Sequence, residues 1–149
     1  MGLLRGNHWH YFDRNQVKQL HMSEPYPAPT SLLLVDDEQD LLDLMQIGLT
    51  AKGYKVAVST NGDDLLDIVA RTAPDAILLD LQMDGVDGST VCHLLRHNTS
   101  TSKIPIVILS GNADIESVAH ECGAHSFLQK PFSATKVDAE LKRVLLMVP

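Results

Sequence analysis

The sequence predicts an α/β domain built on a doubly wound parallel sheet, with five strands and five helices. From residue 31 onward, short apolar segments alternate with segments of helical pattern, as in α/β folds. Three of the apolar segments are hydrophobic at successive positions, which is typical of strands covered by helices on both faces. The length of 149 residues suits one domain with a single core.

Five segments carry the strand signal, and right-handed crossovers limit the possible orders of these strands without choosing one. Their bounds are 32–35, 54–58, 76–79, 104–109 and 126–128. Pro105 stands near the start of the fourth segment, where the missing N–H of a proline costs least.

Apolar residues at helical spacing fill the intervals between the strands. The expected helices cover residues 38–52, 63–72, 89–97, 114–122 and the segment after 133. Ser133 is the expected N-cap of the last helix. The buried side of that helix is expected to carry Val137, Leu141, Val144, Leu145 and Val148.

Residues 1–30 differ in composition from the domain expected at 31–149. Prolines at positions 25, 27 and 29 favour an extended linker, and the residues before them are interpreted as an N-terminal extension or an added segment. Met22 is an alternative start. His8 and His10 are interpreted as surface residues and not as a metal site.

Composition and charge exclude several classes of function. The net charge is -7 and no cluster of Lys and Arg stands out, so direct binding to nucleic acid is not expected. No segment has the length of a membrane span or the pattern of a signal peptide, so a cytoplasmic protein without membrane contact is predicted. Cys92 and Cys122 are interpreted as reduced, partly buried residues, too far apart in the chain for a zinc cluster or disulfide framework.

Five polar residues directly follow the predicted strands. They are Asp36 and Asp37 after the first strand, Asp80 after the third, Ser110 after the fourth and Lys130 after the fifth. Taken singly, each could be a helix cap or a surface residue, and residue 37 or 38 could cap the first helix. Ligands bind beyond the carboxyl ends of parallel strands, however, so the coincidence predicts one site.

The chemistry of this predicted site follows from its charges. Three crowded carboxylates repel one another unless a cation balances them, and oxygen ligands favour Mg²⁺ or Mn²⁺. Lys130 adds a fixed positive charge. A dication, a lysine and a hydroxyl together suit a phosphoryl group, which a carboxylate can accept in line as an acyl phosphate.

The ordered set of motifs resembles the receiver domain of two-component response regulators. The motifs are LVDDE at 34–38, LDLQM at 79–83, DG at 87–88, LSG at 109–111, GA at 123–124 and KPF at 130–132. The resemblance covers residues 31–148. It implies a flavodoxin-like fold with the strand order 2-1-3-4-5 that chemotaxis receivers show.

The resemblance also implies a role for each residue at the site. Asp80 is the implied phosphoacceptor. Asp37, Asp80 and the backbone carbonyl of Gln82 are the implied direct ligands of Mg²⁺, and Asp36 acts through a metal-bound water. Many receivers have a proline where this chain has Asp84.

The remaining implied roles concern the phosphoryl group and the switch. Lys130 pairs with the phosphoryl oxygens and forms a cis peptide bond to Pro131. Ser110 turns its hydroxyl onto the phosphoryl group, and Phe127 is the switch aromatic. Because Phe127 lacks a hydroxyl, its signal must be transmitted through packing.

The implied function is signal relay. A histidine kinase or a phosphotransfer protein donates a phosphoryl group to Asp80, and the altered surface contacts a downstream protein effector. The chain is not expected to be an enzyme beyond its own phosphoryl transfer and dephosphorylation. An inert pseudo-receiver is one alternative, and a fragment of a longer regulator is as compatible as a single-domain protein. A hydrolase of the haloacid dehalogenase type is disfavoured, because Gln82 stands where that family has its second aspartate.

Overall fold

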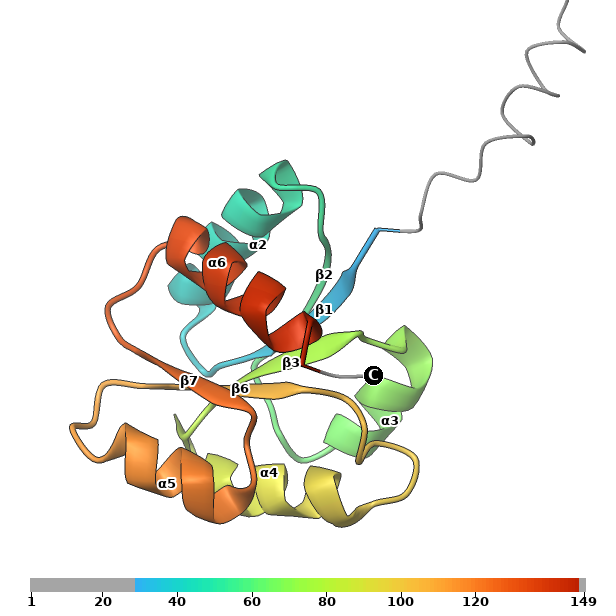
Figure 1. Cartoon of the computed structure of the whole chain (residues 1–149), viewed down its shortest axis with the longest axis vertical. Helices are drawn as coiled ribbons and strands as arrows, with labels where there is room; N and C mark the ends of the chain where they lie inside the picture. The colour runs from blue at the N-terminus through green and yellow to red at the C-terminus, as the bar shows by residue number, and fades with distance from the viewer. Residues whose placement is uncertain (1–28, 148–149) are drawn as a thin grey trace, which may run out of the picture.

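The computed structural model describes residues 29–147 and shows one parallel sheet between two layers of helices (Figure 1). The sheet has the order β2-β1-β3-β6-β7, and every neighbouring pair is parallel. Counted along the chain, these five strands have the expected order 2-1-3-4-5, so the flavodoxin-like fold is confirmed. The strands are β1 (Ser31–Val35), β2 (Lys55–Ser59), β3 (Ala76–Asp80), β6 (Ile106–Ser110) and β7 (Ser126–Gln129).

The five expected helices are present, and their ends lie within about two residues of the predicted bounds. They are α2 (Gln39–Ala51), α3 (Leu65–Thr72), α4 (Gly88–His97), α5 (Ile115–Cys122) and α6 (Ala134–Leu145). Helices α2 and α6 cover one face of the sheet, while α3, α4 and α5 cover the other (Figure 1). Ser133 is the N-cap of α6, as expected, and its hydroxyl accepts a hydrogen bond from the Lys136 N–H at 3.1 Å.

The core is divided by the sheet into two apolar layers. Leu33 and Val35 of β1 point toward α3, α4 and α5, whereas Leu32 and Leu34 point toward α2 and α6. All residues of β3 and β6 are buried. These central strands are apolar at successive positions because both of their faces are covered by helices.

A short antiparallel pair after β3 was not predicted from the sequence. It consists of β4 (Gln82–Met83) and β5 (Val86–Asp87), with the register Met83↔Val86. Strands of two residues are too short to produce a periodic pattern. The Asp84-Gly85 loop is nevertheless a hairpin signal, because Gly85 has the positive φ of 72° that such tight turns require.

The last residue of β3 lies close to the first residue of α4. A side chain at Gly88 would collide with the carbonyl of Asp80, so only glycine permits this approach. The Gly88 N–H also donates to the Leu81 carbonyl at 2.9 Å. This contact fixes the loop that follows Asp80.

The interpretations of residues 1–28 and the expected place of Val148 in the last helix lie outside the described residues. Within residues 29–147, none of the helices combines the length and apolar character needed to cross a membrane.

Candidate functional site

The structure brings together the three carboxylates at the carboxyl ends of β1 and β3, with Asp80 as the last residue of β3. These strands are neighbours, and their register pairs Val35 with Leu79. One carboxylate oxygen from each of Asp36, Asp37 and Asp80 lies within 4.8 Å of the other two. We call these three residues, together with Lys130, the carboxylate edge.

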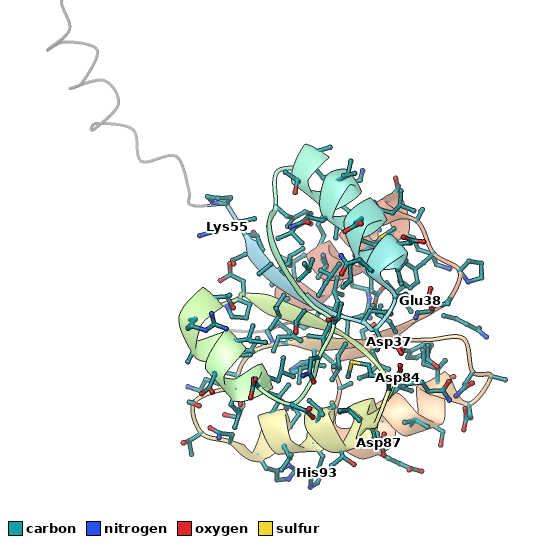
Figure 2. All side chains as sticks on the ribbon, turned by 180° about the vertical axis from the view of Figure 1, so that it is seen from behind. Asp37, Glu38, Lys55, Asp84, Asp87 and His93 are labelled. Carbon is teal, nitrogen blue, oxygen red and sulfur yellow. The ribbon has the colours of Figure 1, made fainter. Side chains whose placement is uncertain are left out.

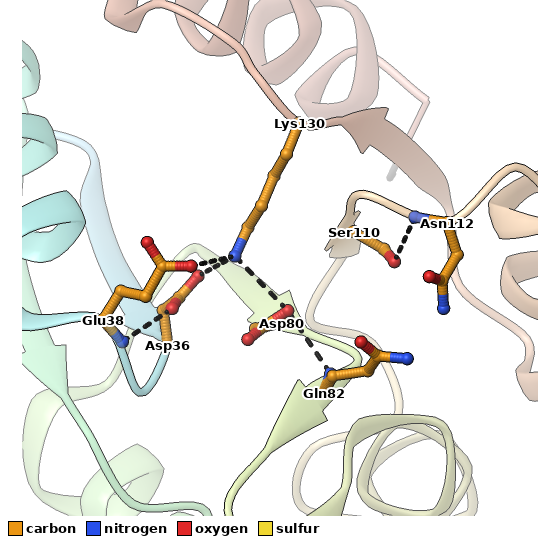
Figure 3. Close-up of polar contacts among 7 residues, drawn as sticks. All are labelled: Asp36, Glu38, Asp80, Gln82, Ser110, Asn112 and Lys130. Carbon is orange, nitrogen blue, oxygen red and sulfur yellow. Dashed lines mark hydrogen bonds and ion pairs between the residues drawn. The ribbon is translucent and has the colours of Figure 1, made fainter.

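Lys130 reaches this edge from the end of β7. Its Nζ atom lies 2.8 Å from Asp36 Oδ2, 3.5 Å from Glu38 Oε1 and 3.6 Å from Asp80 Oδ1 (Figure 3). The Lys130 N–H donates to the Ser110 carbonyl at 2.8 Å, and the bond to Pro131 is cis, as the resemblance implies. One ammonium group therefore faces three carboxylates.

The charge balance of the carboxylate edge is visible in two pKa values. Burial opposes the charged form of Lys130, but the adjacent Asp36, Asp80 and Glu38 outweigh it and raise the pKa of the lysine. Burial first, and then the negative charge of Asp36, raise the pKa of Asp80 from 3.8 to about 6. Lys130 and the Gln82 N–H, which donates to Asp80 Oδ1 at 3.3 Å, act in the opposite direction. The edge thus carries more negative charge than one lysine neutralises.

Ser110 lies at the end of β6, the strand next to β3. Its side chain is buried, and its Oγ accepts a hydrogen bond from the Asn112 N–H at 3.1 Å. Figure 3 shows Ser110, Lys130 and Gln82 around Asp80. A hydroxyl and an ammonium group are therefore both near the carboxylate that is the candidate acceptor.

Phe127 lies away from the carboxylate edge, in the middle of β7. The register pairs Phe127 with Ile108 and Ser110 with Gln129, so the ring is two positions below Ser110 along the sheet. The ring is partly buried, packs against the apolar layer of α3–α5 and lines a cavity of about 660 Å³. Both a core role and a switch role are compatible with this position.

One contact at the site was missed from the sequence. Glu38, one of the two residues that could cap the first helix, stands at the N-cap position of α2, but its side chain makes no cap hydrogen bond. Asp36 instead accepts the Glu38 N–H at 2.9 Å, and the Glu38 carboxylate turns to Lys130. Glu38 therefore occupies the N-cap position without capping the helix through its side chain, which contacts Lys130 instead.

Asp84, the departure from the common receiver pattern, is exposed and stays outside the group of three converging carboxylates. Figure 2 shows Glu38, Asp37, Asp84 and Asp87 following one another along this edge of the molecule. Asp87 has a separate local role, because it caps α4 by accepting the Ser89 N–H at 3.0 Å.

Comparison with known proteins agrees with this geometry. A family model described as the response regulator receiver domain matches residues 32–142. The chain belongs to this family. Receiver domains generally act as signalling phosphoacceptors, typically bind Mg²⁺ through acidic residues, and interact with histidine kinases and downstream effectors.

Individual relatives place this receiver among regulators of different lengths. It is 35% identical over 117 residues to the transcriptional regulatory protein AfsQ1 of Streptomyces coelicolor, covering 77% of this chain and 51% of that protein. It is 38% identical over 115 residues to the response regulator PleD of Caulobacter vibrioides. This match covers 74% of this chain and 25% of PleD. The chain thus spans about half or less of these curated relatives.

Solved structures give the same result for the fold. The receiver domain of NtrX from Brucella abortus superposes with a TM-score of 0.70 at 29% identity, covering 77% of this chain and 98% of that one. The chemotaxis response regulator CheY4 of Vibrio cholerae superposes with a TM-score of 0.72. The match covers 78% of this chain and 98% of CheY4. At 24% identity, this second likeness concerns the fold alone.

The residues of the carboxylate edge fit a hard divalent cation. The donor set is entirely carboxylate oxygen, the ligand type that Mg²⁺ and Mn²⁺ prefer. Burial and, after it, the negative charge of Asp36 raise the pKa of Asp80, so its charged form is disfavoured at this place. Additional positive charge at this place would stabilise the charged form of Asp80.

Proposed function

We propose that this receiver accepts a phosphoryl group on Asp80 in a reaction that depends on Mg²⁺, and that a histidine kinase or a phosphotransfer protein is the donor. The observation that carries the proposal is the convergence of three carboxylates and one ammonium group at the ends of neighbouring strands. A lone aspartate after a strand would not support it.

Asp80 is the nucleophile in this mechanism. One oxygen of its carboxylate attacks phosphorus, the bond from phosphorus to the donor's leaving group breaks, and an acyl phosphate results. The carboxylates of Asp37 and Asp80 and the carbonyl of Gln82 would hold Mg²⁺, with Asp36 acting through a water. When bound, the cation supplies charge that screens the repulsion between the carboxylate and the incoming phosphoryl oxygens.

Lys130 and Ser110 would stabilise the product. The ammonium group already lies 3.6 Å from Asp80 Oδ1, within a short movement of oxygens attached to that carboxylate. To bind the phosphoryl group, the ammonium group of Lys130 would give up some of its contacts with Asp36 and Glu38. Ser110 would donate its hydroxyl to a phosphoryl oxygen, because its own Oγ already accepts the Asn112 N–H.

The proposed signal passes from Ser110 to Phe127 through packing. Movement of Ser110 toward Asp80 would vacate space near β7, and the ring of Phe127 would turn inward to fill it. The surface of α5, β7 and α6 would then change shape and contact a protein effector. Phe127 lines a cavity on one side and packs against the apolar layer on the other, which supports this route.

Phosphoryl uptake from a small donor tests the proposal. With acetyl phosphate and Mg²⁺ the chain should gain one phosphoryl group that base removes and acid preserves, and Asp80→Asn should gain none. Chelation of the cation should abolish uptake by the unaltered chain. Asp84→Asn is the matched control, because Asp84 is a nearby exposed aspartate outside the converging group, and it should still be phosphorylated.

A chain that takes no phosphoryl group from acetyl phosphate or from any kinase would contradict the proposal. The same is true if Asp80→Asn is modified as readily as Asp84→Asn.

A further inference from the structure

The two cysteines are neighbours in space although thirty positions separate them in the chain. Cys92 lies in the middle of α4, and Cys122 is the last residue of α5. Cys92 Sγ donates to the Cys122 carbonyl at 3.5 Å, and Cys122 Sγ donates to the Ala119 carbonyl at 3.5 Å. Both cysteines are free and buried, as expected. They are close in space despite their separation in the sequence.

The two thiols differ in their access to solvent. Cys92 is fully enclosed between α4 and the sheet, with no exposed surface. Cys122 keeps 5% of its surface exposed and lines a cavity of about 300 Å³ between α4 and α5. A small reagent entering this cavity therefore meets Cys122 first, and Cys92 lies behind it.

The surroundings favour a thiolate on the accessible residue. The neighbouring Cys92 side chain lowers the pKa of Cys122 and outweighs the effect of burial. Arg96, one turn after Cys92 on α4, packs its side chain beside Gly123, the residue that follows Cys122, and its guanidinium group donates to the Ser102 carbonyl. A reachable thiol with a lowered pKa and a second cysteine beside it is the arrangement of a redox-active pair.

We propose that Cys92 and Cys122 form a dithiol that hydrogen peroxide converts into an intramolecular disulfide between α4 and α5. The Cys122 thiolate attacks one peroxide oxygen, the O–O bond breaks, and a sulfenic acid and hydroxide form. The Cys92 sulfur then attacks the Cys122 sulfur, and the sulfenic hydroxyl leaves as water with the Cys92 proton. The two cysteines lose two electrons in total, and peroxide is reduced to two molecules of water.

The bridge would restrain a helix next to the proposed switch. Helix α5 packs against α4, β6 and β7, and β7 carries Phe127. A covalent bond at the end of α5 would hold this helix on α4 and limit its movement. The effect on signalling rests on the proposed function. The oxidised chain should still be phosphorylated on Asp80, but phosphorylation should change its α5–β7–α6 surface less than in the reduced chain.

Mass spectrometry of the full chain tests the bridge. After peroxide treatment, denaturation and alkylation, the unaltered monomer should carry no alkyl group and should have lost two hydrogen atoms, and dithiothreitol should restore two alkylatable thiols. Because the chain has only these two cysteines, the assignment is unambiguous. Cys92→Ser and Cys122→Ser are the matched variants, and neither should form the bridged monomer.

The idea is overturned if the unaltered monomer keeps both thiols at peroxide concentrations that oxidise free glutathione. It is also overturned if peroxide yields only disulfide-linked dimers, or sulfinic acid without a bridge. Asp80→Asn should form the same bridge as the unaltered chain. Failure of the proposed phosphoryl transfer would therefore not affect the test of the disulfide, and failure to form the disulfide would not affect the test of phosphoryl transfer.

Discussion

The carboxylate edge and the surface formed by α5, β7 and α6 are stabilised in different ways. At the edge, the buried carboxylates of Asp36 and Asp80 lie within ion-pair distance of the partly buried Lys130, so strong electrostatic forces hold these side chains. At the α5–β7–α6 surface, the partly buried ring of Phe127 borders a cavity of about 660 Å³. Side chains beside such a space can change position without displacing a packed core.

This difference separates the region that takes up a signal from the region that can respond to it. A new charge at the carboxylate edge alters interactions worth several kcal/mol, because the groups there are close together and desolvated. A change in the position of Phe127 alters packing contacts and not ion pairs. Substitutions at the two regions should therefore differ in both the size and the kind of their effects.

The largest effect is expected from Lys130→Met. The ammonium group is the cation that balances Asp36 and Asp80, and removing one partner of a buried ion pair costs about 3 kcal/mol. In urea unfolding at neutral pH with a chelator, the variant should lose about this much unfolding free energy. Added Mg²⁺ should restore part of it, whereas phosphoryl uptake should stay severely reduced.

Lys103→Met is the matched control for this substitution, since Lys103 is exposed in the loop before β6. If Lys130→Met and Lys103→Met are equally stable, the ammonium group of Lys130 does not stabilise the carboxylates of the edge. The proposed difference between the two regions would then be contradicted.

A second prediction concerns the pH dependence caused by Asp80. In the native chain its carboxyl keeps its proton up to a pKa of about 6, whereas the unfolded chain releases it near 3.8. Between these values the native state binds more protons, so its stability falls as pH rises through the window. Above the window the loss is up to about 3 kcal/mol.

Comparison of Asp80→Asn with the unaltered chain isolates this contribution. With a chelator present, the variant should be the more stable protein at neutral pH, and its advantage should vanish near pH 4 (roughly the pKa of an unperturbed aspartate). Unfolding free energies measured across this range provide the check. An advantage that is constant with pH would show that the carboxyl of Asp80 is not destabilised in the native chain.

Phe127→Ala should have a smaller effect on stability and little effect on the chemistry. Truncation of a partly buried ring should cost about 2 kcal/mol, less than in a full core. Initial rates of phosphorylation by acetyl phosphate should remain within about twofold of the unaltered chain, because a surface change of this size barely alters the barrier at Asp80. What should disappear is the phosphorylation-dependent shift of α5 and β7 amide signals in NMR spectra; its persistence would remove Phe127 from the proposed route.

The smallest effect is expected from Glu38→Gln. The Glu38 side chain is 63% exposed, so its ion pair with Lys130 is screened by solvent and weak. Freeing Lys130 from this competitor should raise the rate of phosphorylation by about twofold, which corresponds to roughly 0.5 kcal/mol. Glu116→Gln, an exposed glutamate on α5, should leave the rate unchanged; a tenfold loss in Glu38→Gln would mean that the carboxylate holds Lys130 in a productive position.

The sequence predicted the layers of the fold and the convergence of the site for one physical reason. Central strands are apolar throughout, so the polar residue that follows each strand marks its carboxyl end, as Asp36 and Asp80 do. The order of the strands came from the resemblance to receivers, because periodicity does not say which strands are neighbours. The roles proposed for Ser110, Gln82 and Phe127 came from the same source and await experiment.

The features that were missed depend on contacts that leave little trace in the sequence. The pair β4 and β5 is too short for a periodic signal, and the Asp84-Gly85 turn was the only sign of it. The contact of Glu38 with Lys130 depends on how one side chain turns. The contact between Cys92 and Cys122 arises because α4 packs beside α5, a tertiary arrangement that neither helix pattern encodes.

The most direct test of the account is to locate the phosphoryl group within the chain. Borohydride reduction of the phosphorylated protein converts an aspartyl phosphate into homoserine, and tandem mass spectrometry then reads its position. Homoserine should be found at position 80 and at none of the other aspartates, Asp36 and Asp37 included. Homoserine at either of those residues, or phosphorylated protein without homoserine at position 80, would contradict the assignment of Asp80 as the acceptor.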